Sequence, residues 1–209
     1  MTNTSAAPSR GRPKSASKKT QIYRTASDLF LEHGYDGVSM DQVAERAGVS
    51  KQTVYSHYAS KEALFSACIR NKCADHELYD GALDPALPVA LVLKNLVGRF
   101  NDLFHSDEAI KLKRLLHGHA ESNPRLSEIF FEAGPAMMMQ SLEHYLQTQV
   151  EREVLLIDDI STAARQLLYM IQGEHLMRAT LNVSGGPSDN DNQQYLDACV
   201  ALFLKAYSA

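Results

Sequence analysis

Residues 51–57, Lys-Gln-Thr-Val-Tyr-Ser-His, consist mainly of side chains that donate or accept hydrogen bonds. They stand between Ser50 and Ser60, and each of these serines precedes the expected start of a helix. No acid follows until Glu62. Hydroxyl, amide and ammonium groups on a short helix match the donors, acceptors and methyl groups that base pairs present in the DNA major groove. The chemistry that this stretch indicates is hydrogen bonding to nucleic acid.

Two short helices and a tight turn are expected to position these groups. Ser39 and Gln42 form a capping-box pattern at the start of a helix over 40–47, and Gly48 ends that helix. Val49 fills the core where the two helices meet, and Ser50 caps the next helix, 51–58. Val54 and Tyr58 share one face of it, so Tyr55 is expected to point outward. The pattern favours a helix-turn-helix.

The remaining chain has helical periodicity and no alternating strand pattern. A helix is expected from Lys18 to a C-cap at Gly34, and another from Ser60 to about Tyr79. Further helices are expected over 88–105, 108–121, 124–152 with a break at Gly134-Pro135, 159–181 and 189–207. The predicted fold is all-α, with a disordered basic arm (1–17), a three-helix DNA-binding head (18–64) and a larger helical domain for effector binding and dimerisation (65–209).

Charge divides the chain unevenly. Residues 1–60 carry a net charge of +3 and residues 61–209 carry −7, and the first 24 residues hold six basic side chains and no acid. A basic end on an acidic body indicates contact with a polyanion. No run of about 18 apolar residues and no secretory signal is present, so neither a membrane partner nor export is expected. Three cysteines, an odd number, favour a reducing cytoplasm.

Residues 18–65 resemble the DNA-binding domain of the TetR family of bacterial transcriptional regulators (TetR/AcrR type). The resemblance rests on the stretch TASDLFLEHGYDGVSMDQVAERAGVSKQTVYSHYASKEALF, which spans three helices. It implies a homodimeric regulator, and it assigns base-reading roles to Lys51, Gln52 and Thr53. It also implies that four other side chains contact the DNA backbone: Ser39, Tyr55, His57 and Lys61. Tyr58 stands where the family usually has Phe.

Purely structural or solvated roles are the alternatives for these residues. Lys61 begins a helix whose free N–H groups suit a phosphate, but it could be a solvated surface lysine. Tyr55 could belong to the core, and His57 could simply end its helix. In the arm, Arg10 and Arg12 belong to an Arg-Gly-Arg-Pro pattern, followed by Lys14, that is similar to an AT-hook, which enters an A·T-rich minor groove. A generic basic tail is the alternative, and both interpretations predict salt-sensitive DNA binding.

The last two predicted helices carry wide apolar stripes, which could be ordinary core. The resemblance favours a two-fold dimer interface there, with candidates Leu167, Leu168, Ile171, Leu196, Val200 and Phe203. A homodimer would place two recognition helices about 34 Å apart on a palindromic operator. The middle helices are expected to enclose a pocket for a small-molecule effector, largely apolar, from Phe100, Phe104, Leu116, Phe130, Met137, Met138 and Tyr169. The C-terminal region resembles that of AefR-like members of the family.

Repression is favoured, because an occupied operator blocks polymerase without further surfaces; activation remains the alternative. An enzyme is disfavoured by the lack of a phosphate loop, a nucleophile elbow or a paired-carboxylate site, and no cofactor is expected. A metal sensor could use His117 and His119, but two residues apart on a helix they diverge. A thiol sensor could use Cys68 and Cys73, which also diverge.

Overall fold

The computed structural model describes residues 13–79 and 81–209, with side chains from Ser17 onward. These residues form eleven α-helices, and no strand is found among them beyond an isolated bridge between Leu155 and Ser208. The all-α prediction is confirmed. The chain divides into two compact units, residues 1–68 and residues 69–209.

The first unit consists of α1 (Pro13–His33), α2 (Met40–Arg46), α3 (Lys51–His57) and the first half of α4 (Lys61–Asp75). Serine caps start the short helices, as predicted: the hydroxyls of Ser39, Ser50 and Ser60 accept from backbone N–H groups at the helix starts. Gly34 (φ 73°) and Gly48 (φ 62°) adopt the left-handed backbone conformation that ends α1 and turns the chain after α2.

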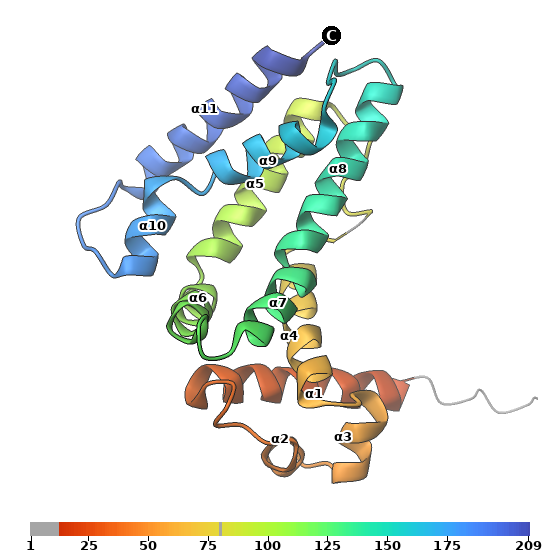
Figure 1. Cartoon of the computed structure of the whole chain (residues 1–209). Helices are drawn as coiled ribbons and strands as arrows, with labels where there is room; N and C mark the ends of the chain where they lie inside the picture. Colours follow the sequence, from red (N-terminus) through yellow and green to blue (C-terminus); the bar gives the residue numbers. More distant parts are fainter. Residues whose placement is uncertain (1–12, 80) are drawn as a thin grey trace, which may run out of the picture. The chain divides into compact units, whose positions relative to one another are not determined.

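The core of the first unit joins all four helices. The apolar face of α1 is buried, and Val43, Val54 and Leu64 from the other three helices are completely inaccessible to solvent. Phe30, Tyr35 and Phe65 form an aromatic cluster with ring centroids 5.2–5.6 Å apart. α1 packs against α2, and α2 packs against α3, which holds α3 at the surface of the unit (Figure 1).

The second unit contains the rest of α4 and seven further helices within the described residues. They are α5 (Val89–His105), α6 (Asp107–His119), α7 (Pro124–Ala133), α8 (Pro135–Glu151), α9 (Ile160–Met170), α10 (Gly173–Leu181) and α11 (Asp189–Tyr207). α11 packs along α5, and α8 packs against both α7 and α9 (Figure 1). The caps predicted at Asn123 and Ser188 and the break at Gly134-Pro135 are confirmed.

Three helix boundaries differ clearly from the prediction. α4 ends at Asp75 and not near Tyr79. α1 begins at Pro13 and not at Lys18, so residues 13–17 of the predicted disordered arm are helical. The helix predicted over 159–181 is two helices, because Gly173 (φ 54°) leaves the right-handed region between α9 and α10. A Cβ at Gly173 would lie 3.0 Å from the Tyr195 ring, so glycine suits this close approach as well.

The six side chains predicted for the dimer interface lie within the second unit. All six candidate side chains are buried within the core of the second unit, each at most 7% exposed: Leu167, Leu168, Ile171, Leu196, Val200 and Phe203. The same helices instead expose other large apolar groups, namely Tyr169, Tyr195 and Leu202.

Candidate nucleic-acid interface

α3 presents a polar outer face. Val54 is inaccessible and Tyr58 is 5% exposed, whereas Tyr55, one position after Val54, is 44% exposed. Lys51 and Gln52 are also exposed. The predicted orientation of Tyr55 away from the core is thus confirmed, and the face of α3 available to a partner carries an ammonium, an amide and a phenol.

Two hydrogen bonds fix the helix-turn-helix to α1. The phenol of Tyr58 donates to the carbonyl oxygen of Lys19 (3.4 Å), and Gln21 Nε2 donates to the carbonyl oxygen of Ala47 (2.8 Å). The first bond uses the hydroxyl that a phenylalanine would lack. Together the bonds hold both the C-terminal end of α3 and the turn before it against one helix, which limits the tilt of the exposed face.

Lys51 is engaged by a carboxylate on the preceding helix. Its Nζ lies 2.8 Å from Asp41 Oδ1 and 2.9 Å from Oδ2, and 5.9 Å from the centre of the Tyr55 ring. The hydrogen bond to Asp41 raises the pKa of Lys51. Both side chains are exposed, so this pair contributes little to stability, but it orients the ammonium across the start of α3.

The hydroxyl groups of Thr53 and Ser56 on α3 both make local contacts within the first unit. Thr53 Oγ1 lies 2.8 Å from Ser50 Oγ, and the Ser56 hydroxyl donates to the carbonyl oxygen of Thr53 (2.8 Å). A hydroxyl oxygen in such a local hydrogen bond is held in place and still has a lone pair that can accept a further bond. Thr53 is half-buried, so it offers less surface to a partner than Gln52 does.

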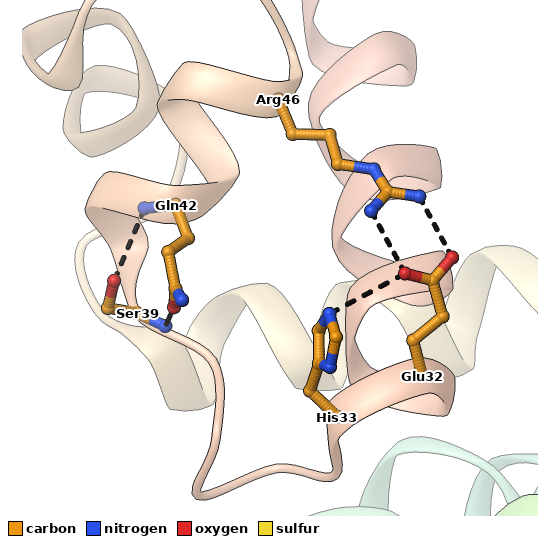
Figure 2. A network of polar contacts seen from close by, with 5 residues as sticks. All are labelled: Glu32, His33, Ser39, Gln42 and Arg46. Carbon is orange, nitrogen blue, oxygen red and sulfur yellow. Dashed lines mark hydrogen bonds and ion pairs between the residues drawn. The ribbon is translucent and has the colours of Figure 1, made fainter.

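The segment between α1 and α2 is braced by polar contacts (Figure 2). The Ser39 N–H donates to Gln42 Oε1 (2.7 Å), and the Ser39 hydroxyl accepts from the Gln42 N–H (3.2 Å), which completes the predicted capping box. Arg46 binds Glu32 of α1 through two parallel hydrogen bonds of 2.9 and 2.8 Å, and His33 Nε2 lies 3.6 Å from the same carboxylate. The sequence reasoning missed this bidentate pair.

Lys61 has more partners than a solvated surface lysine would. Its ammonium donates to the carbonyl oxygen of Val38 (2.9 Å) and lies 4.2 Å from the centre of the Tyr35 ring. Burial lowers the pKa of Lys61, and nearby Asp36 partly opposes that effect. The side chain therefore joins the start of α4 to the segment before Ser39, so the two predicted backbone-contact residues lie at adjoining helix starts.

Of the remaining predicted DNA contacts, the structure describes the side chain of His57 but not those of the arm residues. His57 is half-buried at the end of α3, with its ring centroid 6.5 Å from that of Tyr58. Arg10 and Arg12 lie outside the described residues, and so does the side chain of Lys14.

The predicted effector residues have different environments in the second unit. Phe100 and Met138 line a small cavity together with Leu78, Tyr79, Leu96 and Leu142. Water can reach only about 10 Å³ of it, roughly the space of one molecule. Leu116 is buried and Phe104 and Phe130 are half-buried, whereas Met137 and Tyr169 are exposed to solvent.

The alternative sites receive no added support from the geometry. Cys68 and Cys73 are buried, and burial raises the pKa of each thiol to about 11, which disfavours the reactive thiolate. His117 is exposed, and His119 Nδ1 pairs with the carbonyl oxygen of Leu115. Within residues 13–79 and 81–209, no group of three or more His, Cys, Asp or Glu residues is placed to hold a metal ion, and no helix is long and apolar enough to cross a membrane.

Two protein families match this chain. Residues 22–68 match the family described as bacterial regulatory proteins, tetR family, and residues 91–209 match the family described as AefR-like transcriptional repressor, C-terminal domain. The second match alone covers more than half of the chain.

Individual relatives agree with these matches. The chain is 32% identical over 148 residues to the HTH-type transcriptional regulator RutR of Escherichia coli K12, which is 71% of this chain and 63% of RutR. It thus spans less than two thirds of that curated relative. A solved TetR-family regulator from Mesorhizobium loti superposes with a TM-score of 0.74 at 30% identity over 96% of this chain and 100% of that one. The flavonoid-responsive regulator FrrA gives a TM-score of 0.72 at 28% identity, covering 92% and 98% of the two chains.

Proposed function

The chain belongs to the TetR family of helix-turn-helix transcription regulators, a DNA-binding and non-enzyme class, and we propose that it acts as a homodimeric repressor released from a palindromic operator by a small molecule. The observation that carries the proposal is the division of α3 into a buried edge, Val54 and Tyr58, and an exposed polar face. A helix whose outer face consists of hydrogen-bonding groups is suited to the major groove.

The proposed contacts divide into two kinds. Lys51, Gln52 and Thr53 read base edges, because they occupy the first turn of α3. Ser39, Tyr55, His57 and Lys61 contact the DNA backbone. Lys61 donates to the carbonyl oxygen of Val38, the residue before Ser39. This closeness supports contact of Ser39 and Lys61 with the same phosphate. The arm residues Arg10, Arg12 and Lys14 enter the adjacent minor groove.

Dimerisation is proposed for the second unit. Its last helices expose three large apolar side chains that a partner subunit would cover: Tyr169 (61% exposed), Leu202 (58%) and Tyr195 (43%). A two-fold axis there would repeat the head on both sides of an operator, with half-sites about 34 Å apart. The proposed boundaries of the functional parts are 18–64 for DNA binding and 65–209 for effector binding and dimerisation.

Repression is preferred to activation because the matched C-terminal family is described as a transcriptional repressor domain. The effector is proposed to enter the second unit beside Phe100 and Met138, whose cavity would have to widen to admit it. FrrA, a structural relative, is described as flavonoid-responsive, which supports a largely apolar effector. The protein acts on chromosomal DNA in the bacterial cytoplasm.

Selection from a random duplex pool tests the proposal. The full chain should enrich a palindrome with half-sites separated by about one helical turn, 10–10.5 base pairs. Light scattering should give the mass of a dimer, and of a dimer on each enriched duplex. Enrichment of no sequence at low ionic strength, or binding as a monomer to a single half-site, would contradict it.

A further inference from the structure

Three basic side chains of the second unit lie together without a carboxylate partner among the described residues. The rings of His105, at the end of α5, and His175, on α10, are 4.3 Å apart in an edge-to-face arrangement. Lys113 of α6 is close enough to His105 to act on its charge, and its ammonium lies 5.5 Å from the centre of the Phe104 ring. Within the described residues we find no hydrogen bond or ion pair to that ammonium.

Two ring nitrogens in this cluster, His105 Nε2 and His175 Nδ1, are buried and have no hydrogen-bond partner among the residues that the structure describes. His105 Nδ1 lies 2.8 Å from the carbonyl oxygen of Asn101, which can only accept, so this nitrogen carries the proton. His105 Nε2 is therefore an unsatisfied acceptor while the ring is neutral. If the ring takes up a proton, the same atom becomes a donor that needs an acceptor.

The surroundings of His105 disfavour its protonation in the absence of a ligand. Burial is the main cause that lowers the pKa of His105, and His175 from α10 and Lys113 from α6 lower it further. The hydrogen bond to Asn101 and the carboxylate of Asp102, on its own helix, act in the opposite direction. Burial also lowers the pKa of Lys113. An anion beside His105 and Lys113 would favour the imidazolium and the ammonium and so raise both pKa values.

We propose that His105, Lys113 and His175 form a binding site for the carboxylate group of an aromatic ligand, held between α5, α6 and α10. His105 takes one proton from solvent as the ligand binds, and its Nε2–H and the Lys113 ammonium donate to the carboxylate oxygens. These are charge-assisted bonds, the strong kind for such a group. The half-buried Phe104 provides the aromatic surface beside it, and its ring centroid lies 5.4 Å from that of the buried Phe100.

The cluster lies near the surface, although His105 Nε2 and His175 Nδ1 are themselves inaccessible, so the rings must turn to meet a ligand. The side chains of His105, Lys113, His175 and Phe104 are half-buried, so each retains a solvent-accessible part. Phe100 extends the aromatic surface inward, because it also lines the small cavity next to Met138. An aromatic carboxylate is favoured over inorganic phosphate because the Phe104 ring lies beside the donors and phosphate has no apolar group to pack against it.

The site would also control the position of α10. Arg114, the residue after Lys113, donates to the carbonyl oxygens of Thr180 (2.9 Å) and Ala179 (2.5 Å) at the end of that helix. A ligand held by Lys113 and His175 would add a second link between α6 and α10. Its use as the effector that releases DNA rests on the proposed function, whereas its binding does not.

Calorimetry on the full chain without DNA tests the site, with benzoate as the probe and benzamide as its neutral match. Benzoate should bind at least roughly tenfold more tightly at about pH 6 than at about pH 8, because binding takes up a proton. Benzamide should not bind. Acetate should bind more weakly than benzoate, and inorganic phosphate should not compete.

Variants make the test specific. Lys113→Gln should weaken benzoate binding by roughly tenfold or more, whereas Lys111→Gln, an exposed lysine on the same helix, should leave it unchanged. His105→Gln should reduce the difference between the two pH values, and unchanged thermal unfolding of each variant confirms folding. No benzoate binding, equal binding at both pH values, equal binding by the two lysine variants, or preference for phosphate would overturn the proposal. Because no DNA is present, these results do not depend on operator binding.

Discussion

The ammonium of Lys51 lies 2.8 Å from a carboxylate oxygen of Asp41, so a proposed base-reading side chain is paired within the protein itself. An operator must either displace Asp41 or use the protons of the ammonium that Asp41 leaves free. The carboxylate lies on α2. If Lys51 contacts DNA as proposed, we expect Asp41 to oppose binding through both competition and charge.

Asp41→Asn should strengthen DNA binding, and it should do so for unrelated duplexes as well as for the operator. The substitution releases Lys51 and removes a negative charge, and neither effect depends on base sequence. Fluorescence anisotropy at two salt concentrations measures it, with Asp28→Asn, an exposed acid of α1, as the charge-matched control. Equal affinities for Asp41→Asn and the control would show that the pair has no role in binding.

Ser39 can be tested for two separate roles. Ser39→Ala removes the cap of α2 and should destabilise the chain by about 1 kcal/mol in urea unfolding. Ser39→Asp keeps a good capping group but places a carboxylate where a phosphate is proposed, so stability should be retained while DNA affinity falls by roughly tenfold or more. Retained DNA affinity in Ser39→Asp would remove Ser39 from the proposed backbone contacts.

The bidentate pair between Arg46 and Glu32 should stabilise the head modestly. A double-mutant cycle with Arg46→Gln and Glu32→Gln should give a coupling energy of about 0.5–1 kcal/mol, because both side chains are about half exposed. The coupling should shrink in concentrated salt. Urea unfolding provides the measurement, and a cycle on the exposed Arg125 and Glu128 of α7 should give a smaller value.

The buried thiols should be unreactive in the folded chain. The pKa of Cys68 and of Cys73 is raised from 9.0 to about 11 by burial, so both stay protonated at neutral pH and react with a thiol reagent only after unfolding. The unfolded chain loses these protons first as pH rises above about 9, so the free energy of unfolding should fall between about pH 9 and pH 11. Rapid labelling of native Cys68 at neutral pH would instead favour the thiol sensor.

Local signals in the sequence predicted much of the fold. Ser39, Ser50 and Ser188 mark helix starts because a side-chain oxygen must satisfy the free N–H groups there. The break before α10 was missed because apolar residues recur at helical spacing on both sides of Gly173, and periodicity does not reveal a left-handed residue. A glycine inside an apparently continuous helix was the available signal.

Contacts between distant residues could not be predicted in the same way. Periodicity identified Leu167 and Phe203 as apolar but could not distinguish core from dimer interface, and the structure buries both in the core of the second unit. Arg46 and Glu32 are 14 positions apart, and no spacing rule links them. The outward face of α3 was predictable because Val54 and Tyr58 are separated by one helical turn and define the buried edge on their own.

The central claim is that the exposed face of α3 reads base sequence, and a repeated selection with Gln52→Ala tests it most directly. The variant should lose preference at one symmetric pair of operator positions, at a cost of about 1–3 kcal/mol for the original base, while its affinity for unrelated DNA is unchanged. Gln140→Ala, an exposed glutamine of α8, should select the same sequences as the unaltered chain. If Gln52→Ala selects that same operator with the same preference at every position, the claim is wrong.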